Sequence, residues 1–220
     1  MIVKICGLRR ADHASAAAAA GADWIGLVFA ASKRQVSVAE ASAIAMALRE
    51  GVTPPPLLAG LFVNEAPATI TAIAHAVGLD LIQLSGDEPV EYADALRLPV
   101  LKTIRLTGAP AEQAWIARAR REQPEREAVS ARTPPRVLLL VDAHVPGSYG
   151  GTGTPADWSR AAALAAQTPL ILAGGLHPAN VARAIATVRP IGVDVSSGVE
   201  TDGVKDPARI EAFIAAVRSA

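Results

Sequence analysis

Short apolar segments recur eight times along the chain, and each precedes a longer stretch with the apolar spacing of an amphipathic helix. The segments are rich in Val, Ile and Leu, and this alternation predicts βα units built around a parallel sheet. Several are apolar almost throughout, as expected of strands covered on both faces. The expected strands are 2–6, 24–29, 57–63, 81–84, 100–104, 137–141, 170–173 and 192–195.

Eight units in 220 residues leave about 27 residues each, which suits an α/β fold of the (β/α)8 TIM-barrel type in one domain, 1–220. An open doubly wound sheet is the main alternative. Its usual dinucleotide fingerprint is absent, because CGLRR follows the first strand where G-x-G-x-x-G would be expected. Segment 107–135 exceeds the regular spacing, and we expect it to hold the fifth helix and an exposed, mobile extension.

Charge and cysteine content narrow the class of partner. The 21 basic and 21 acidic side chains balance, which argues against a nucleic-acid-binding surface and favours a small-molecule ligand. A single cysteine forms no internal disulfide, which points to the cytoplasm. The uncharged stretch 161–182 is interrupted by proline and glycine, so we expect no membrane span, and the N-terminus does not resemble a secretory signal.

Polar residues interrupt the predicted strands at defined positions. Because strand residues alternate between the barrel interior and the helix layer, a polar residue on the inward face stands out. The carboxyl ends of the strands are also where barrel enzymes carry their chemistry. The polar residues expected to converge there are Lys4, Cys6, Gln83, Asp142, Asp194 and Ser196.

Cys6 and Asp142 are the candidates for proton transfer. Cys6 ends the first strand with Lys4 on the same face, and a nearby cation favours the thiolate. Asp142 follows five apolar residues, where protonation would suit a general acid. The structural alternatives remain open: a small buried side chain for Cys6, and an aspartate satisfied by backbone donors for Asp142.

Two successive loops indicate a phosphate site. Gly174 and Gly175 follow the seventh strand, and Ser196, Ser197 and Gly198 end the eighth. Barrel enzymes often hold phosphate between these loops and a short extra helix, where glycine admits close backbone N–H groups and serine adds donors. A third glycine-rich loop, YGGTG at 149–153, is expected to cover the site as a lid.

A basic loop follows the second strand. Its Arg34 could hold a carboxylate in a bidentate fork, although a solvated base is the usual state of such a residue on an exposed loop. The four histidines show no metal-binding spacing, and His144 adds only a weak candidate near Asp142. We therefore expect no metal. The histidines are His13, His75, His144 and His177.

In order along residues 4–206, the motifs resemble those of the phosphoribosylanthranilate isomerase family. They are KICGL, GLVF followed by SKRQVS, GLFVN, LIQLSGDE, LLLVDAHVPGSYGGTG, LAGGLHPANV and GVDVSSGVET followed by GVKD. KICG and VDVSSGVE are the specific ones, whereas the GG and SSG loops occur in many phosphate-binding barrels.

The resemblance implies an Amadori rearrangement of N-(5-phosphoribosyl)anthranilate to 1-(2-carboxyphenylamino)-1-deoxyribulose 5-phosphate in tryptophan biosynthesis, with no metal or cofactor. It places the general base on Cys6, the general acid on Asp142 and the anthranilate carboxylate on Arg34. A raised carboxyl pKa and a lowered thiol pKa would set the two protonation states apart. We expect a monomer or a homodimer. The full substrate-binding set is Arg34, Gly174, Gly175, Asp194, Ser196, Ser197 and Gly198.

The chain departs from the family pattern in three places. Ser85 stands where relatives usually have the histidine of QLHG, the loop AASKRQ lacks the usual aromatic and proline residues, and segment 107–135 is long. Other possibilities are another phosphate-binding barrel enzyme, such as an epimerase or a histidine-pathway isomerase, a flavin-binding barrel, and a barrel without catalytic activity. An epimerase would need a metal-binding set of His and Asp. A histidine-pathway isomerase would give Cys6 no catalytic role.

Overall fold

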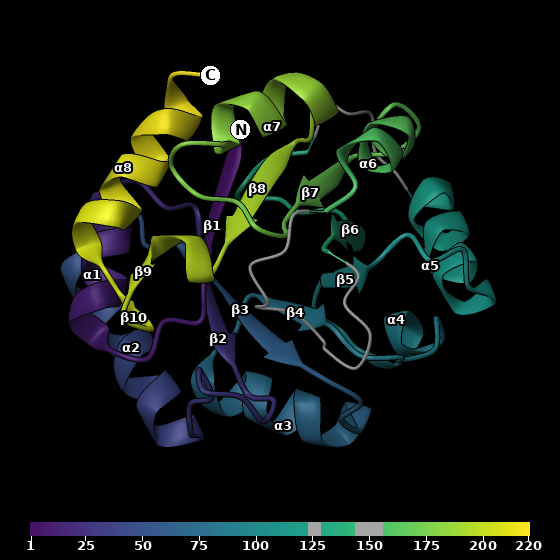
Figure 1. The fold of residues 1–220 in the computed structure, drawn as a ribbon. Coiled ribbons are helices and arrows are strands. Elements are labelled where there is room, and N and C mark those ends of the chain that lie inside the picture. The colour runs from purple at the N-terminus through teal and green to yellow at the C-terminus, as the bar shows by residue number, and fades with distance from the viewer. Residues whose placement is uncertain (123–128, 144–155) are drawn as a thin grey trace.

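Within the residues that the structure describes, 1–122, 129–143 and 156–220, eight parallel strands form a closed barrel surrounded by helices (Figure 1). The structure is a computed structural model. Each strand pairs with the next, and the barrel closes where β1 pairs with β8, with Lys4 opposite Asp194. The predicted TIM barrel is confirmed, and the open doubly wound sheet is excluded.

The barrel strands are β1 (Ile2–Cys6), β2 (Trp24–Val28), β3 (Leu57–Phe62), β4 (Leu81–Leu84), β5 (Val100–Ile104), β6 (Val137–Val141), β7 (Leu170–Leu172) and β8 (Gly192–Val195). The α-helices are α1 (Ala11–Ala19), α2 (Val38–Gly51), α3 (Pro67–Val77), α4 (Tyr92–Ala95), α5 (Pro110–Arg121), α6 (Trp158–Ala165), α7 (Val181–Val188) and α8 (Pro207–Arg218). After β8 come a short 3₁₀ helix, η2 (Ser197–Val199), and a two-stranded antiparallel hairpin, β9 (Glu200–Thr201) and β10 (Val204–Lys205).

Five of the eight predicted strands have the expected bounds, and three end one residue early. Those three were expected to include Phe29, Val63 and Ala173. The backbone ladder continues briefly past two of these ends: the Phe29 N–H donates to Leu61 O at 2.9 Å, and the Ala173 N–H to Val141 O at 2.7 Å. The pattern therefore predicted the extent of pairing well, because hydrogen bonding decays over one residue at a strand end.

Strand alternation produces two apolar layers. The larger layer lies between strands and helices and includes Val3, Ile5 and Phe213. The smaller layer fills the barrel interior, where Trp24 and Leu101 belong to a group of inward-facing residues. Since one strand face packs on the helices and the other fills the barrel, almost every strand residue is buried, which explains the near-continuous apolar runs.

Helix starts carry local signals that agree with the fold. Ser37 and Glu40 form a reciprocal capping box at the start of α2, and proline occupies the first turn of α3, α5 and α8. Among the helices of the described ranges, the structure contains none that is long and apolar enough to cross a bilayer.

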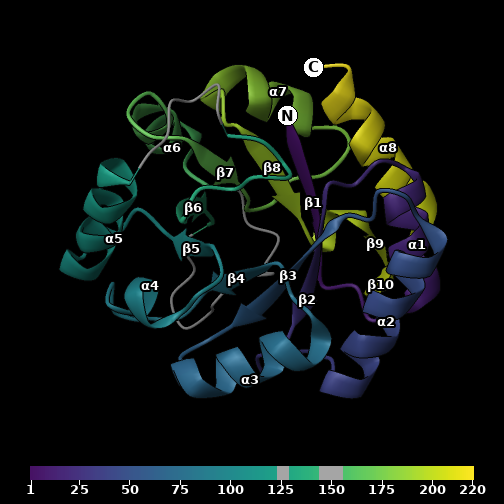
Figure 2. The same ribbon diagram turned by 180° about the vertical axis from the view of Figure 1, so that it is seen from behind.

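The structure corrects one expectation about the long segment between β5 and β6. The fifth helix is present as α5, but the chain after it is only partly the exposed extension that we expected. Ala131 packs against the barrel interior, and its carbonyl accepts a hydrogen bond of 2.8 Å from Trp24 Nε1. Figure 2 shows residues 129–136 running across the barrel on their way into β6. These residues therefore lie over the end of the barrel opposite the carboxyl ends of the strands.

We expect Trp24→Phe to lower the free energy of unfolding by about 1–2 kcal/mol, because the Ala131 carbonyl loses its donor in a partly buried setting. Trp158→Phe is the matched control, since the buried Trp158 Nε1 has no hydrogen-bond partner among the described residues. Urea denaturation of both variants measures the difference. Equal losses would show that the Trp24 hydrogen bond does not stabilise this end of the barrel.

Candidate active site

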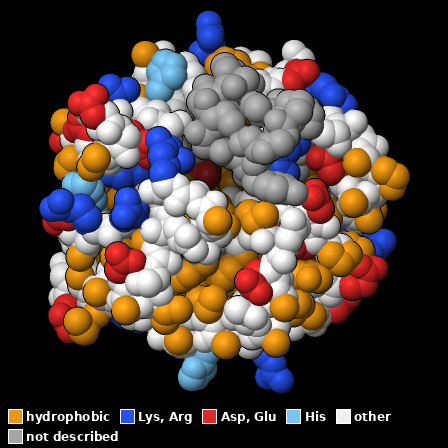
Figure 3. All heavy atoms as spheres, turned by 60° about the horizontal axis from the view of Figure 1, so that its bottom comes forward, with side chains coloured by type: hydrophobic (Ala, Val, Ile, Leu, Met, Phe, Trp, Pro, Cys, Tyr) orange, Lys and Arg blue, Asp and Glu red, His pale blue; other side chains and the backbone are white. Residues whose placement is uncertain are grey.

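A cavity of about 750 Å³ opens at the carboxyl ends of the strands. It brings together residues from β1, β4, β6 and β8 with the loop after β2. Figure 3 shows hydrophobic side chains gathered near the centre of the face turned toward the viewer. The expected convergence is confirmed for all the polar residues named above except Lys4, which lies beneath the cavity floor. The polar residues lining the cavity include Cys6, Arg34, Gln83, Asp142, Asp194 and Ser196.

Lys4 is fully buried inside the barrel and forms an ion pair with Asp194. Its Nζ atom lies 2.9 Å from Asp194 Oδ1, across the seam where β1 pairs with β8. Burial opposes the charge of Lys4, but Asp194 and Cys6 together raise its pKa, so the ammonium is retained. Asp194 was predicted to bind substrate. Its position also pairs it with Lys4 within the protein.

Gly26 on β2 makes room for this cluster. A Cβ atom on Gly26 would lie 2.7 Å from Cys6 Sγ and 3.0 Å from Lys4 Nζ. The first distance is shorter than real Cβ atoms show and the second is tight, so glycine at this position leaves room for the thiol and the ammonium beside β2.

The ionisation of Cys6 corrects a sequence-based expectation. We expected the neighbouring lysine to lower the thiol pKa, but burial raises it above its usual value of 9.0. The Lys4 and Lys205 charges act in the expected direction, whereas Asp194 opposes them. Desolvation outweighs these charges because Cys6 is only 4% exposed.

Asp142 ends the inward face of β6, and its pKa is raised as predicted. Burial is the main cause, and the Asp194 charge adds to it. A hydrogen bond of 2.8 Å from the Ala143 N–H and the charge of Arg105 oppose the shift without cancelling it. A backbone donor therefore stabilises the ionised Asp142 only in part, since the pKa of the carboxyl is still raised.

Arg34 is not the solvated base that its loop would suggest. The residue is 9% exposed, and its Nε and Nη2 atoms donate to the two carboxylate oxygens of Glu200 at 2.6 and 3.0 Å. Gly7 lies under its side chain: a Cβ on Gly7 would be 2.5 Å from Arg34 Cδ, and the φ of +77° suits glycine. The guanidinium is thus held beside Cys6 at the cavity wall.

The two predicted phosphate loops lie against each other. A Cβ on Gly198 would lie 1.8 Å from the Leu176 carbonyl oxygen, so the loop after β8 packs directly on the loop after β7. Gly174 and Gly175 have φ values of +81° and +61°. Ser197 and Gly198 belong to η2, the short helix that such sites commonly include.

Gly174 lies close to the end of β6. A Cβ there would come within 3.1 Å of Asp142 Oδ1, so Gly174 also leaves room for the Asp142 carboxylate. Asn180 fixes the same loop by accepting from the His177 N–H at 2.8 Å and donating to Gly175 O at 2.9 Å.

One side of the cavity is apolar despite the unusual loop sequence. Phe29, Leu61 and Val63 line it together with Ala30 and Ala31. The Phe29 ring stacks on Phe62 with a centroid separation of 5.1 Å. The aromatic surface missing from AASKRQ is therefore supplied from the end of β2, next to Arg34.

Ser85 lies on the inward face of β4, where relatives usually carry histidine. Its Oγ lies 3.0 Å from Thr103 Oγ1 on β5, and Gln83 Nε2 donates to both hydroxyls. This position therefore provides the cavity with a neutral hydroxyl that is paired with Thr103.

Our sequence reasoning left several polar residues near the site unassigned, and three of them affect the charges there. Arg105 follows β5 on the inward face of LKTIR, so the alternation rule used for the other strands would have found it. Glu200 and Lys205 lie on the β9–β10 hairpin, where no strand pattern points inward. Only their inclusion in the motifs GVET and GVKD marked them.

Some expectations lie outside the described residues: His144 and the glycine-rich loop 149–153 belong to the range 144–155. Within 1–122, 129–143 and 156–220, no group of three or more His, Cys, Asp and Glu side chains is arranged to hold a metal ion.

Comparison with known proteins identifies the family. The family model for N-(5'-phosphoribosyl)anthranilate (PRA) isomerase matches residues 3–216. The N-(5'-phosphoribosyl)anthranilate isomerase of Roseiflexus castenholzii is 53% identical over 224 residues, covering 100% of this chain and 99% of the relative.

Solved structures agree. Phosphoribosyl anthranilate isomerase from Thermotoga maritima matches with a TM-score of 0.81 at 33% identity, covering 100% of both chains. A phosphoribosyl anthranilate isomerase in complex with reduced 1-(o-carboxyphenylamino)-1-deoxyribulose 5-phosphate matches with a TM-score of 0.78 at 31% identity, again over 100% of both chains. With the barrel and its cavity, these matches show that the chain belongs to the N-(5'-phosphoribosyl)anthranilate isomerase family of tryptophan biosynthesis.

Proposed function

We propose that Cys6 and Asp142 are the general base and general acid with which this chain isomerises N-(5'-phosphoribosyl)anthranilate. The observation that carries the proposal is their joint position on the wall of one cavity, at the ends of β1 and β6. No other cysteine is available in the chain. The aldose-to-ketose reaction needs one group that gives a proton and one that takes a proton, and a buried carboxyl and a thiol beside a lysine suit these tasks.

The reaction begins at Asp142 in this proposal. Its carboxyl protonates the ring oxygen of the furanose as the bond from that oxygen to C1 breaks, which leaves a protonated Schiff base. The Cys6 thiolate then removes the C2 proton, and the electron pair moves through C1 to the nitrogen to form an enolamine. The enolamine tautomerises to the ketone, so no proton or electron is gained overall.

Cys6 and Asp142 hold one proton between them in the working form of the enzyme. The working form, with a neutral Asp142 and a Cys6 thiolate, carries as many protons as the form with a carboxylate and a thiol. Because the pKa of both groups is raised, kcat/KM should be highest between the carboxyl pKa and a thiol pKa above 9.0. Lys4 supports the thiolate from beneath, within its ion pair with Asp194.

We assign three parts of the cavity to three parts of the substrate. Arg34 takes the anthranilate carboxylate, and the apolar wall of Phe29, Leu61 and Val63 takes the ring. The phosphate lies against Gly174, Gly175, Ser196, Ser197 and Gly198, where two loops and η2 meet. Asp194 faces the reacting sugar between these regions.

We also propose that the chain acts in the cytoplasm as a monomer or a homodimer. Its family's biosynthetic role and its single cysteine support the location. A solved relative from Thermotoga maritima at 31% identity is described as dimeric, with monomers generated from it.

Cys6→Ala and Asp142→Asn should each lower kcat by about 10²–10⁴-fold while leaving the circular dichroism spectrum unchanged, since each removes one proton-transfer group. The exposed Asp202→Asn is the matched control and should retain the parental kcat. The wild-type gene should rescue a tryptophan auxotroph that lacks this isomerase step. Normal turnover in either active-site variant would exclude the assigned role.

Arg34→Ala should raise KM for N-(5'-phosphoribosyl)anthranilate by about 10–100-fold with a smaller change in kcat, because a charge-assisted contact is lost in ground and transition states alike. Steady-state kinetics measure both constants. An unchanged KM would remove Arg34 from the substrate-binding set.

Lys4→Met should raise the pKa of the Cys6 thiol further, because the Lys4 charge lowers that pKa in the native protein. Ultraviolet absorbance of the thiolate, taken as the difference from the Cys6→Ala protein to remove the two tyrosines, reports on Cys6, as the chain has one cysteine. The Lys4→Met/Asp194→Asn double variant should lie between wild type and Lys4→Met, since Asp194 acts in the opposite direction. Lys33→Met is the exposed control. A lower thiol pKa in Lys4→Met would contradict this account.

A further inference from the structure

The carboxylate of Glu200 lies at the centre of three cationic side chains. Its Oε1 accepts from Arg34 Nε at 2.6 Å and from Lys205 Nζ at 2.7 Å, and its Oε2 accepts from Arg34 Nη2 at 3.0 Å. Lys33 Nζ lies 3.6 Å from Oε2. The Glu200 side chain is only 6% exposed. Burial opposes its ionisation, but the hydrogen bonds from Arg34 and Lys205 lower its pKa to about 2.

The β9–β10 hairpin holds Glu200 in position. Glu200 is the direct cross-strand neighbour of Lys205, whose Nζ also donates to the Ser196 carbonyl at 2.8 Å. Thr201 Oγ1 donates to Asp206 Oδ2 at 2.7 Å, and Asp206 in turn caps α8. The carboxylate is therefore attached both to the end of β8 and to the start of the last helix.

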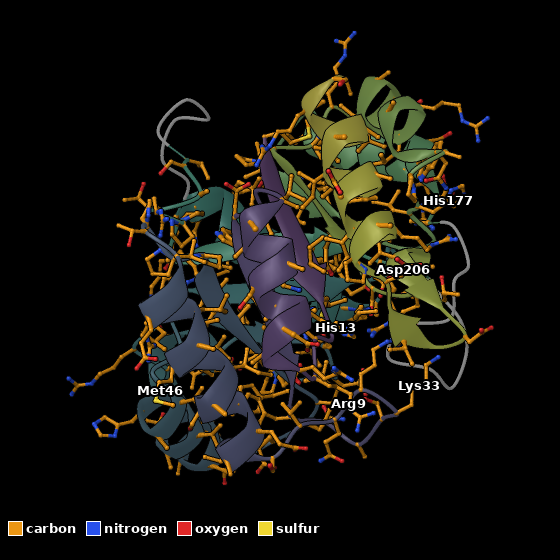
Figure 4. The ribbon with its side chains drawn as sticks, turned by 90° about the vertical axis from the view of Figure 1, so that its left-hand side faces the viewer. Arg9, His13, Lys33, Met46, His177 and Asp206 are labelled. Carbon is orange, nitrogen blue, oxygen red and sulfur yellow. The ribbon has the colours of Figure 1, made fainter. Side chains whose placement is uncertain are left out.

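The loop that carries Arg34 is attached to the same side of the molecule. Arg9 Nη1 donates to the Lys33 carbonyl at 3.1 Å, and Figure 4 shows Arg9 and Lys33 close together on the side where Asp206 also lies. Gly7 leaves space for the Arg34 stem. Thus Arg34 is restrained at its backbone, at Cδ and at one edge of its guanidinium.

A guanidinium offers two edges, each able to hold a carboxylate in a bidentate fork. Glu200 occupies the edge formed by Nε and Nη2. Within the described residues, the edge formed by Nη1 and the second Nη2 hydrogen has no recorded partner, and Arg34 lines the cavity. Only this edge remains for a ligand.

We propose that Glu200 is a positioning residue for the isomerisation: it holds one edge of Arg34 so that the other edge faces the anthranilate carboxylate. The proposal rests on the assignment of that carboxylate to Arg34. Two effects of Glu200 compete. Its negative charge repels a second carboxylate, whereas its bidentate contact removes the rotational freedom of the arginine. We expect the ordering effect to prevail, because the neighbouring Lys33 and Lys205 already offset the charge.

Binding of two stable ligands separates these effects. The first is reduced 1-(o-carboxyphenylamino)-1-deoxyribulose 5-phosphate, and the second is the same compound without the carboxyl group. In Glu200→Gln we expect Kd, measured by calorimetry, to rise about tenfold or more for the first ligand and less than about threefold for the second. KM for the substrate should rise in parallel, with kcat changed less than KM.

Three further variants complete the test. Glu200→Asp keeps the charge beside Lys205 but shortens its reach to Arg34, so it should show a smaller loss in the same direction, and it serves as the test variant if Glu200→Gln does not fold. The exposed Glu211→Gln on α8 should bind both ligands as wild type does. In an Arg34→Ala background, Glu200→Gln should add no further carboxylate-specific loss.

Equal losses for both ligands in Glu200→Gln would overturn the proposal, because they would place its effect on the phosphate loop through Lys205. Tighter binding of the carboxylate ligand would also overturn it, since repulsion would then prevail. If Arg34→Ala lost no preference for the carboxylate, the assignment of Arg34 itself would fail. A selective loss in Arg34→Ala without one in Glu200→Gln would reject the role of Glu200 alone.

Discussion

Closure of the barrel between β1 and β8 sets Lys4 directly opposite Asp194, inside the molecule. Their ion pair, at 2.9 Å, lies deeper in the barrel than Cys6, and of the two only Asp194 lines the cavity. A charged pair at this depth is tolerated because each charge neutralises the other, and removal of one partner would leave an uncompensated buried charge. The seam of the barrel is therefore also the electrostatic base of the active site.

Burial acts in the same direction on the pKa of both proposed proton-transfer groups, but with different chemical results. It raises the pKa of the Asp142 carboxyl, which favours the protonated form that an acid requires, and it raises the pKa of the Cys6 thiol, which disfavours the thiolate that a base requires. Two cations near Cys6 counteract the effect of burial, because the charges of Lys4 and Lys205 lower the pKa of the thiol. A chain of zero net charge thus places Lys4 and Lys205 close enough to Cys6 to act on its thiol.

Much of the fold and part of the site were predictable from local patterns. Strand alternation placed Cys6, Asp142 and Asp194 on one face, because a two-residue period leaves no choice once the apolar face is assigned. Arg105 would have followed from the same rule. Glu200 and Lys205 would not, since they come from a hairpin beyond the barrel. The structure corrected the burial of Arg34, the packing of Ala131 against the barrel end and the direction of the Cys6 pKa shift.

The sequence by itself determined the eight βα units, the inward face of each strand and the motifs that identify the family, because these depend on periodicity and on residues adjacent in the chain. Only the tertiary structure decided which groups share charges. Arg34 meets Glu200 and Lys4 meets Asp194 because the fold brings together residues up to 190 positions apart. Burial and ion pairing depend on three-dimensional neighbours, so the ionisation of the site could not be read from spacing along the chain.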